Sequence, residues 1–160
     1  MPQSVVVSES EYTRLVKFGR VFFGTLSQSI SASGDYDIGI TVPASVNDRF
    51  LRLVSVASTV GTSYISIYQG ITSYTGGTAL SMPNQNNKIA TTPSIEIKYG
   101  VTPTLGASYK TVDNHYFAVA GQMTPVENMQ LLLPSGVYDI RMHNGSGGTG
   151  VLSVAIQLIE

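Results

Sequence analysis

The chain of 160 residues contains no cysteine and no tryptophan. Without cysteine it cannot form a disulfide, a thiolate nucleophile or a cysteine-based zinc site. Charged residues make up only 12% of the chain, about half of the roughly 25% that is usual in soluble domains. A net charge of −1 provides no basic footprint for nucleic acid or for an anionic membrane surface. The composition therefore predicts no nucleic-acid partner and no membrane partner.

Long hydrophobic runs are also missing. The longest are triplets such as Val21-Phe22-Phe23 and Leu131-Leu132-Leu133, far short of the roughly 20 apolar residues of a membrane-spanning helix. The first residues lack the basic and apolar regions of a signal peptide, so none is expected. Mean hydropathy is nevertheless +0.15, because serine and threonine replace charged residues. Such a surface suits a protein that works inside an assembly, and equally a merely neutral β-protein.

One helix is predicted, over residues 9 to 18. Ser8 and Glu11 have the spacing of a capping box, and Gly19 follows where a left-handed C-terminal residue is favoured. Before this helix stands the β-branched triplet Val5-Val6-Val7. We interpret it as an arm that adds a strand to a sister chain or a partner, or as an ordinary first strand. Residues 1–20 are thus expected to form an arm and short helix, and residues 21–160 one β-sandwich domain.

After Gly19 the hydrophobic pattern changes from helical spacing to a period of two, which is typical of half-buried strands. It is clearest at residues 36–42, 64–68, 95–99, 138–143 and 152–158. Residues 50–58 change faces midway, so they form either a strand covered on both sides or one with a bulge near Leu53. Turn clusters separate the runs, among them 31–35, 75–78 and 83–87. The Asn-Gly in segment 144–150 predicts a hairpin between the last two strands.

About nine or ten short strands and a single short helix predict an all-β fold, an antiparallel β-sandwich. Within that class we favour a jelly roll over a closed barrel.

Catalytic residues are scarce. The two histidines, His115 and His143, fall on separate predicted strands, and no nucleophile elbow accompanies them. Asp35 and Asp37 are too few to hold calcium and are better explained as a turn that enters a strand. We therefore expect no enzyme activity, no catalytic residue, no cofactor and no metal.

Tyrosine, with nine copies, is the one abundant aromatic residue. Tyr64 and Tyr68 alternate with Ile65 and Ile67, so they should lie on the outer face of their strand, and Tyr74 is expected in the loop that follows. Outward tyrosines mark a contact with protein or sugar, or a cross-strand pair within the sheet. With the valine triplet, these three tyrosines are the candidate interaction residues.

Several phrases in the second part of the chain share a pattern. They are Tyr64-Ile65-Ser66-Ile67-Tyr68-Gln69, Gly76-Gly77-Thr78-Ala79-Leu80, Asn84-Gln85-Asn86-Asn87, Leu133-Pro134-Ser135-Gly136-Val137-Tyr138-Asp139-Ile140-Arg141-Met142-His143-Asn144-Gly145-Ser146 and the strand Leu152 to Glu160. Over roughly residues 50 to 160 these phrases resemble small head decoration, or cement, proteins of tailed bacteriophages. The match is approximate: Asn87-Lys88 stands where that family has Asn-Arg, and the last residue follows an isoleucine where that family often has an aromatic.

The resemblance implies a protein on the outer surface of a virion that clamps neighbouring major capsid subunits. It also implies self-association, with a trimer favoured over a dimer. The alternative is a receptor- or carbohydrate-binding module of a phage tail or baseplate, which would use the outward tyrosines and the amide-rich loop.

Overall fold

The computed structural model describes residues 10–44, 49–117, 120–126 and 131–160, with the backbone alone for 113–117. It contains α1 (Glu11–Lys17), β1 (Val21–Ile30), β2 (Asp35–Val42), β3 (Phe50–Ser58), β4 (Ser63–Ala79), β5 (Glu96–Phe117), β6 (Gln122–Pro125), β7 (Leu131–Leu132), β8 (Gly136–His143) and β9 (Gly150–Ile159).

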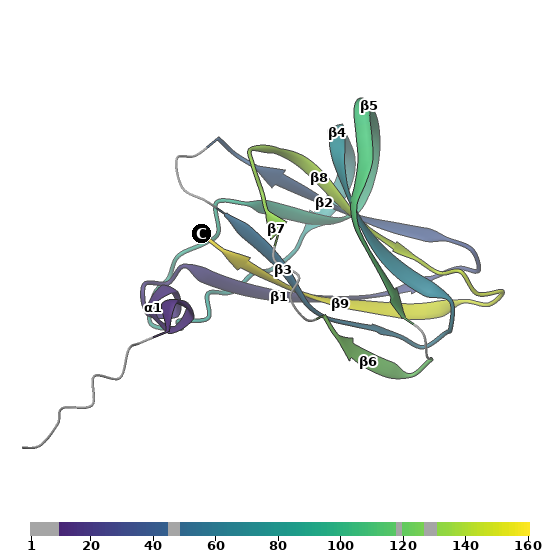
Figure 1. The fold of residues 1–160 in the computed structure, drawn as a ribbon, viewed down its shortest axis with the longest axis horizontal. Coiled ribbons are helices and arrows are strands. Elements are labelled where there is room, and N and C mark those ends of the chain that lie inside the picture. The colour runs from purple at the N-terminus through teal and green to yellow at the C-terminus, as the bar shows by residue number, and fades with distance from the viewer. Residues whose placement is uncertain (1–9, 45–48, 118–119, 127–130) are drawn as a thin grey trace, which may run out of the picture.

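These strands form two antiparallel sheets that pack as layers (Figure 1). The first sheet has the order β1-β9-β3-β6, and β7 pairs with the start of β3. In the second sheet β8 lies between β2 and β4, and β5 pairs with β4 and with β2, so the four strands are connected in a ring. The prediction of an all-β sandwich with one short helix is confirmed. The jelly-roll variant stays a prediction.

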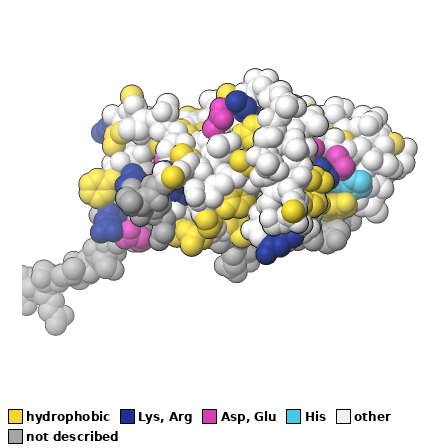
Figure 2. All heavy atoms as spheres, turned by 90° about the horizontal axis from the view of Figure 1, so that it is seen from above, with side chains coloured by type: hydrophobic (Ala, Val, Ile, Leu, Met, Phe, Trp, Pro, Cys, Tyr) yellow, Lys and Arg dark blue, Asp and Glu magenta, His cyan; other side chains and the backbone are white. Residues whose placement is uncertain are grey.

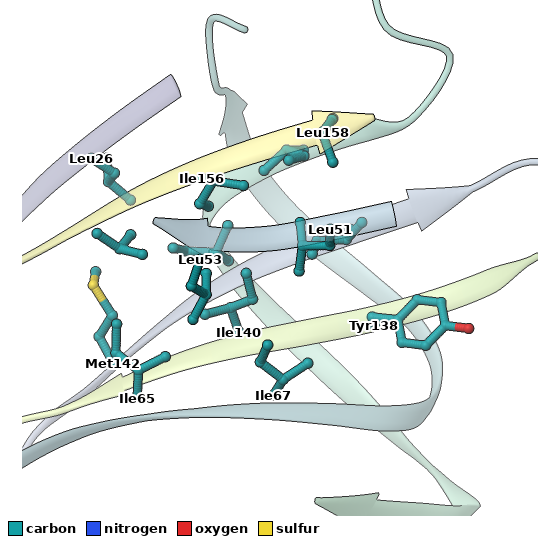
Figure 3. Close-up of a cluster of buried hydrophobic side chains, with 14 of the residues drawn as sticks. Leu26, Leu51, Leu53, Ile65, Ile67, Tyr138, Ile140, Met142, Ile156 and Leu158 are labelled. Carbon is teal, nitrogen blue, oxygen red and sulfur yellow. The ribbon is translucent and has the colours of Figure 1, made fainter. Parts of the chain in front are cut away.

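The core lies between the two sheets and consists of the apolar residues that alternate along the strands. Ile38, Ile65 and Ile140 come from the second sheet and Leu53 and Ile156 from the first, all fully buried. Figure 3 shows side chains of both layers meeting in this cluster. Burial of such side chains is worth roughly 1.5–3 kcal/mol each, so the period-two pattern accounts for the existence of the sandwich.

The irregular strand β3 contains the bulge that the sequence suggested. Its register against β9 shifts between Leu53 and Ser55. Leu51 and Leu53 before the shift and Val56 after it are all buried. One extra residue therefore keeps apolar side chains on the core face on both sides of the bulge.

The helix is shorter than predicted and is capped by a different residue. Ser10 is the N-cap, since its Oγ accepts a hydrogen bond from Thr13 N at 3.2 Å. The proposed cap Ser8 lies outside the described residues. Gly19 has a φ of 68° at the C-terminal end, as expected. Nearby, Glu160 N donates to Arg20 O at 3.0 Å, so the helix and the C-terminal strand lie at the same end of the molecule (Figure 1).

The predicted hairpin between the last two strands is wrong. β8 belongs to the second sheet and β9 to the first, so segment 144–149 crosses from one layer to the other. Asn144 is fully buried there, and its side-chain amide donates to the backbone oxygens of Ile30, Ser31 and Gly148 at 2.8–3.0 Å. The asparagine thus ties the crossing to the β1–β2 turn, where the sequence suggested a hairpin tip.

The turn expected at residues 75–78 is also wrong, because this segment continues β4. Gly76 and Gly77 have φ values of 71° and 90°, which glycine adopts at little cost, so the strand can coil without ending. Residues 70–79 of β4 and 98–109 of β5 form a long two-stranded ribbon, which we call the β4–β5 ribbon. Figure 1 shows β4 and β5 running together beyond the rest of the second sheet.

Candidate functional site

The outer face of the second sheet carries most of the charged and aromatic side chains that contact one another. Alternation along β2, β4 and β8 directs these residues away from the core. They are Asp35 and Asp37 on β2, Tyr64 and Tyr68 on β4, and Asp139, Arg141 and His143 on β8.

An acid–arginine centre, formed by Asp37, Asp139 and Arg141, lies in the middle of this face. Asp37 and Arg141 are opposite each other in the β2–β8 register. Arg141 Nε donates to Asp37 Oδ1 at 2.7 Å, and its Nη2 reaches Asp37 Oδ2 at 3.4 Å. Such two-pronged pairs are among the stronger ionic contacts in proteins. Arg141 Nη2 also lies 4.0 Å from Asp139 Oδ2, so one guanidinium serves two carboxyl groups.

Asp139 is the unusual member of the centre. Its side chain is 1% exposed, and neither carboxyl oxygen has a hydrogen-bond partner in the structure. Burial, reinforced by repulsion from Asp37, raises the pKa of the Asp139 carboxyl to about 8, although Arg141 acts in the opposite direction. At neutral pH this carboxyl is therefore mainly protonated, since a buried charge without a full set of partners is costly.

Burial alone would lower the pKa of the Arg141 guanidinium, but its hydrogen bond and charge interaction with Asp37 raise it above its usual range. The guanidinium carbon lies 5.4 Å from the ring centre of Tyr68, a cation–π distance. Tyr68 stacks on Tyr109 of β5, with ring centres 5.0 Å apart and planes 10° apart. Burial raises the pKa of the Tyr109 hydroxyl, so this ring stays uncharged beside the centre.

A second group lies at the edge of the same face. His143 Nδ1 is 2.6 Å from Asp35 Oδ1, and Tyr64 stacks on the imidazole with ring centres 4.5 Å apart. Figure 2 shows histidine, acidic and basic side chains together at one end of the molecule. His115 lies on β5, a different strand from His143 as predicted, but its side chain is outside the described part of the structure.

Tyr74 is in β4, so its predicted position in a loop is wrong. Its hydroxyl lies 2.6 Å from Thr41 Oγ1 on β2. The ring packs on Gly39, where an added Cβ would come within 2.5 Å of a ring carbon. Tyr74 therefore brings the β4–β5 ribbon over the outer face of β2, and a glycine there permits this close approach.

The structure places the six candidate interaction residues in different ways. Tyr64 and Tyr68 lie on the outer face, as predicted, and both also make stacking contacts within the sheet. Tyr74 packs over the same face. Val5, Val6 and Val7 lie outside the described residues. Whether any of these six residues contacts a partner stays a prediction.

The outer face of the first sheet is different in kind. We call its uncovered part the open face. It consists of the small, uncharged residues Thr25, Ser27, Ser55, Ala57, Ser153 and Ala155, which surround a shallow hollow of about 200 Å³ together with Met123. Met123 is 72% exposed. The helix covers the other end of this face, where Tyr12 Oη accepts from Gln157 Nε2 at 3.1 Å.

No group of three or more metal-ligating side chains occurs within the described ranges. Both oxygens of Asp37 are engaged by Arg141, which leaves this residue poorly suited to calcium. In the described part of the chain, no helix is long and apolar enough to cross a membrane.

Asp139, Arg141 and Tyr109 were not singled out from the sequence as site residues. The alternation at residues 138–143 does place Asp139 and Arg141 on the outer face. Their partners depend on the register between β2 and β8, which lie about a hundred residues apart and which no local pattern fixes.

The chain matches no protein-family model, no curated protein and no solved structure.

Proposed function

We propose that this protein is a capsid decoration protein, which binds an assembled phage head and stabilises it by clamping neighbouring major capsid subunits. The observation that carries the proposal is the open face. It combines small side chains with an absence of charge, so a partner surface could approach closely without desolvating ions. The resemblance of residues 50 to 160 to cement proteins supplies the identity of the partner.

The strand orders support the same proposal. The first sheet has the order β1-β9-β3-β6 and the second contains the order β2-β8-β4-β5. Apart from the consecutive pairs β4–β5 and β6–β7, successive strands of the chain alternate between the two layers, which favours the jelly-roll interpretation. Jelly rolls are common in viral structural proteins, so this interpretation fits a place in a virion.

The proposed mechanism is stabilisation by selective binding. A protein that binds the assembled shell but not dispersed subunits shifts the equilibrium toward the shell by mass action. If the chain associates as a trimer or dimer, several weak contacts act together and strengthen the binding. Most of the surface seen in Figure 2 is neither charged nor hydrophobic, which suits contacts made mainly by shape and hydrogen bonds.

The direct test is co-sedimentation with undecorated shells assembled from the capsid protein encoded beside this gene. Wild-type protein should pellet with shells and raise their melting temperature, but it should not bind dispersed subunits. The double variant Ala57→Lys with Ser153→Lys introduces two charges into the open face, so binding should be lost. Thr102→Lys adds a charge to an exposed position of the β4–β5 ribbon and serves as the matched control.

The result against the proposal is clear. A folded wild-type protein that fails to bind such shells, or shells that melt at the same temperature with and without it, would overturn the decoration function. Equal binding by wild type and the double lysine variant would assign the contact to another surface.

The valine arm has its own test. We expect deletion of residues 1–8 to leave a folded domain that binds shells weakly, because Val5, Val6 and Val7 are suited to strand addition. Circular dichroism would check the fold and co-sedimentation the binding. Unchanged binding by the truncated protein would remove the arm from the proposal.

A second candidate function is carbohydrate or receptor binding. It is favoured by the half-buried tyrosines beside polar side chains on the second sheet, because sugars commonly stack on aromatic rings. Binding to glycans without affinity for empty heads, lost in Tyr64→Ala but retained in the double lysine variant, would support this candidate against decoration.

A further inference from the structure

The acid–arginine centre holds more negative than positive groups. Asp37 and Asp139 face one guanidinium, and Asp35 also lies at its edge, with Oδ2 3.9 Å from Arg141 Nε. The two-pronged contact with Asp37 occupies much of the guanidinium. Asp139 is left buried with both oxygens unpartnered. A carboxyl group in this position is far more stable when it carries a proton.

Tyrosines of β4 and β5 lie around the position of Asp139. Tyr68 is the direct neighbour of Asp139 in the β4–β8 register. On the other side, Gly39 is its neighbour in the β2–β8 register, and the ring of Tyr74 lies on that glycine. Tyr109 of β5 stacks on Tyr68. The burial of Asp139 therefore depends on where the β4–β5 ribbon lies.

We propose that Asp139 keeps its proton while the β4–β5 ribbon covers it, so that lifting the ribbon releases this proton. The β4–β5 ribbon should therefore open less often in mild acid than in mild alkali. This inference does not depend on the decoration function.

Each strand next to Asp139 contributes titratable side chains. β2 contributes Asp37 and Asp35, β8 contributes Arg141, β4 contributes Tyr68 and Tyr74, and the described side chains of β5 contribute Tyr109. Arg141 remains charged and Tyr109 remains neutral across neutral pH, because the pKa of each group is raised. Both oxygens of Asp37 accept from Arg141. Asp139 is therefore the group that changes its protonation when the ribbon moves.

Because opening of the ribbon is linked to release of the Asp139 proton, the opening equilibrium depends on pH. In the closed chain the pKa of Asp139 is about 8, whereas a hydrated aspartate has a pKa near 4. Between these values the open form has lost a proton that the closed form keeps. The opening equilibrium should rise by about tenfold for each pH unit in this range and level off above pH 8.

The test is amide hydrogen exchange of the β4–β5 ribbon in the full chain, corrected for the intrinsic effect of pH on exchange. Between pH 5.5 and 7.5, the opening constant of Ser73, Thr75, Thr102 and Thr104 should rise by up to about a hundredfold. Asp139→Asn keeps the shape of the side chain but cannot titrate, so its opening constant should be constant with pH. Glu11→Gln removes an exposed carboxylate on the helix and should behave as wild type.

A direct measurement on the wild type keeps the test decisive if the Asp139→Asn variant does not fold. The carboxyl carbon resonance of Asp139 should titrate far above an ordinary aspartate. In Tyr74→Ala this pKa should fall, because water reaches the carboxyl group. In Asp37→Asn it should also fall, because the neighbouring negative charge is gone and Arg141 is free to pair with Asp139.

Three results would overturn the inference. The first is an Asp139 carboxyl that is already ionised at pH 6. The second is an opening constant of the ribbon that is flat with pH in the wild type. The third is an Asp139 titration that is unmoved in both Tyr74→Ala and Asp37→Asn.

Discussion

The two outer faces of the sandwich arise from the same alternating pattern and yet have opposite characters. On the first sheet the outward residues of the open face are small and uncharged, and they lie uncovered. On the second sheet they include the acid–arginine centre and the tyrosines, and the β4–β5 ribbon lies over them. Alternation decides which residues leave the core. What covers them afterwards is decided by a distant part of the chain.

The open face of the first sheet is therefore free to contact a partner, whereas the outer face of the second sheet is occupied by contacts within the chain. The polar groups of the second sheet find most of their partners within the chain, so changes there should affect stability. The open face has few internal contacts, so changes there should affect stability little and binding more. The following predictions test this division.

The largest effect should come from removal of the shared guanidinium. Arg141→Ala leaves Asp37 and Asp139 without their cation, and breaking such a partly buried pair costs about 3–5 kcal/mol. Arg52 is an exposed arginine on the outer face of the first sheet, and Arg52→Ala should change stability by less than about 0.5 kcal/mol. Urea denaturation of both variants at pH 7 measures this contrast. Equal losses of stability in the two variants would show that charged residues on the two faces contribute equally to the fold.

The next largest effect should be at the crossing between the sheets. Asn144→Ala removes three donated hydrogen bonds to Ile30, Ser31 and Gly148 and empties a fully buried position. A loss of about 2–4 kcal/mol is expected. Asn87 is exposed, so Asn87→Ala is the matched control and should be nearly neutral. Thermal unfolding followed by circular dichroism gives the comparison, and a neutral Asn144→Ala would contradict the anchoring role.

A smaller effect is expected where the ribbon meets β2. Gly39→Ala places a Cβ within 2.5 Å of the Tyr74 ring, which should displace the ring at a cost of about 1–3 kcal/mol. An added Cβ at Gly61 meets nothing within 4 Å, so Gly61→Ala should cost much less. Fluorescence-detected unfolding and the hydrogen exchange of Thr75 would report the two changes. Normal protection of Thr75 in Gly39→Ala would argue against the close packing.

The smallest effect should be on the open face. Ser27→Ala removes the hydroxyl contact between Ser27 and Ser153, whose Oγ atoms are 2.7 Å apart and near solvent. Exposed hydrogen bonds contribute little net stability, so a change below about 1 kcal/mol is expected. Chemical denaturation would detect a larger one. A loss as large as that of Arg141→Ala would erase the distinction between the faces.

Much of the fold could be predicted because local patterns control it. The alternating apolar residues identify the strands of the core, and the change of faces in β3 reveals the bulge after Leu53. Gly19 marks the end of the helix for a steric reason that the sequence alone displays. In each case, neighbours within a few residues decide the conformation.

The errors have a common cause in contacts between distant segments. Gly76 and Gly77 predict a turn, but pairing with β5 keeps them in an extended ribbon. Asn144 and Gly145 predict a hairpin, but the side chain of Asn144 binds the turn after β1 instead. The centre on the second sheet could be predicted only as a set of outward residues, because the pairing of Asp37 with Arg141 depends on strand register.

The contact between Glu160 N and Arg20 O places the end of β9 beside the entry to β1. A short linker between Ser10 and Glu160 could therefore close the described chain without crossing the sandwich. New ends could be opened at Gly61 or Gly147, where an added Cβ meets nothing within 4 Å. The sandwich should tolerate such a circular permutation, and cargo fused there would project from the end opposite the helix.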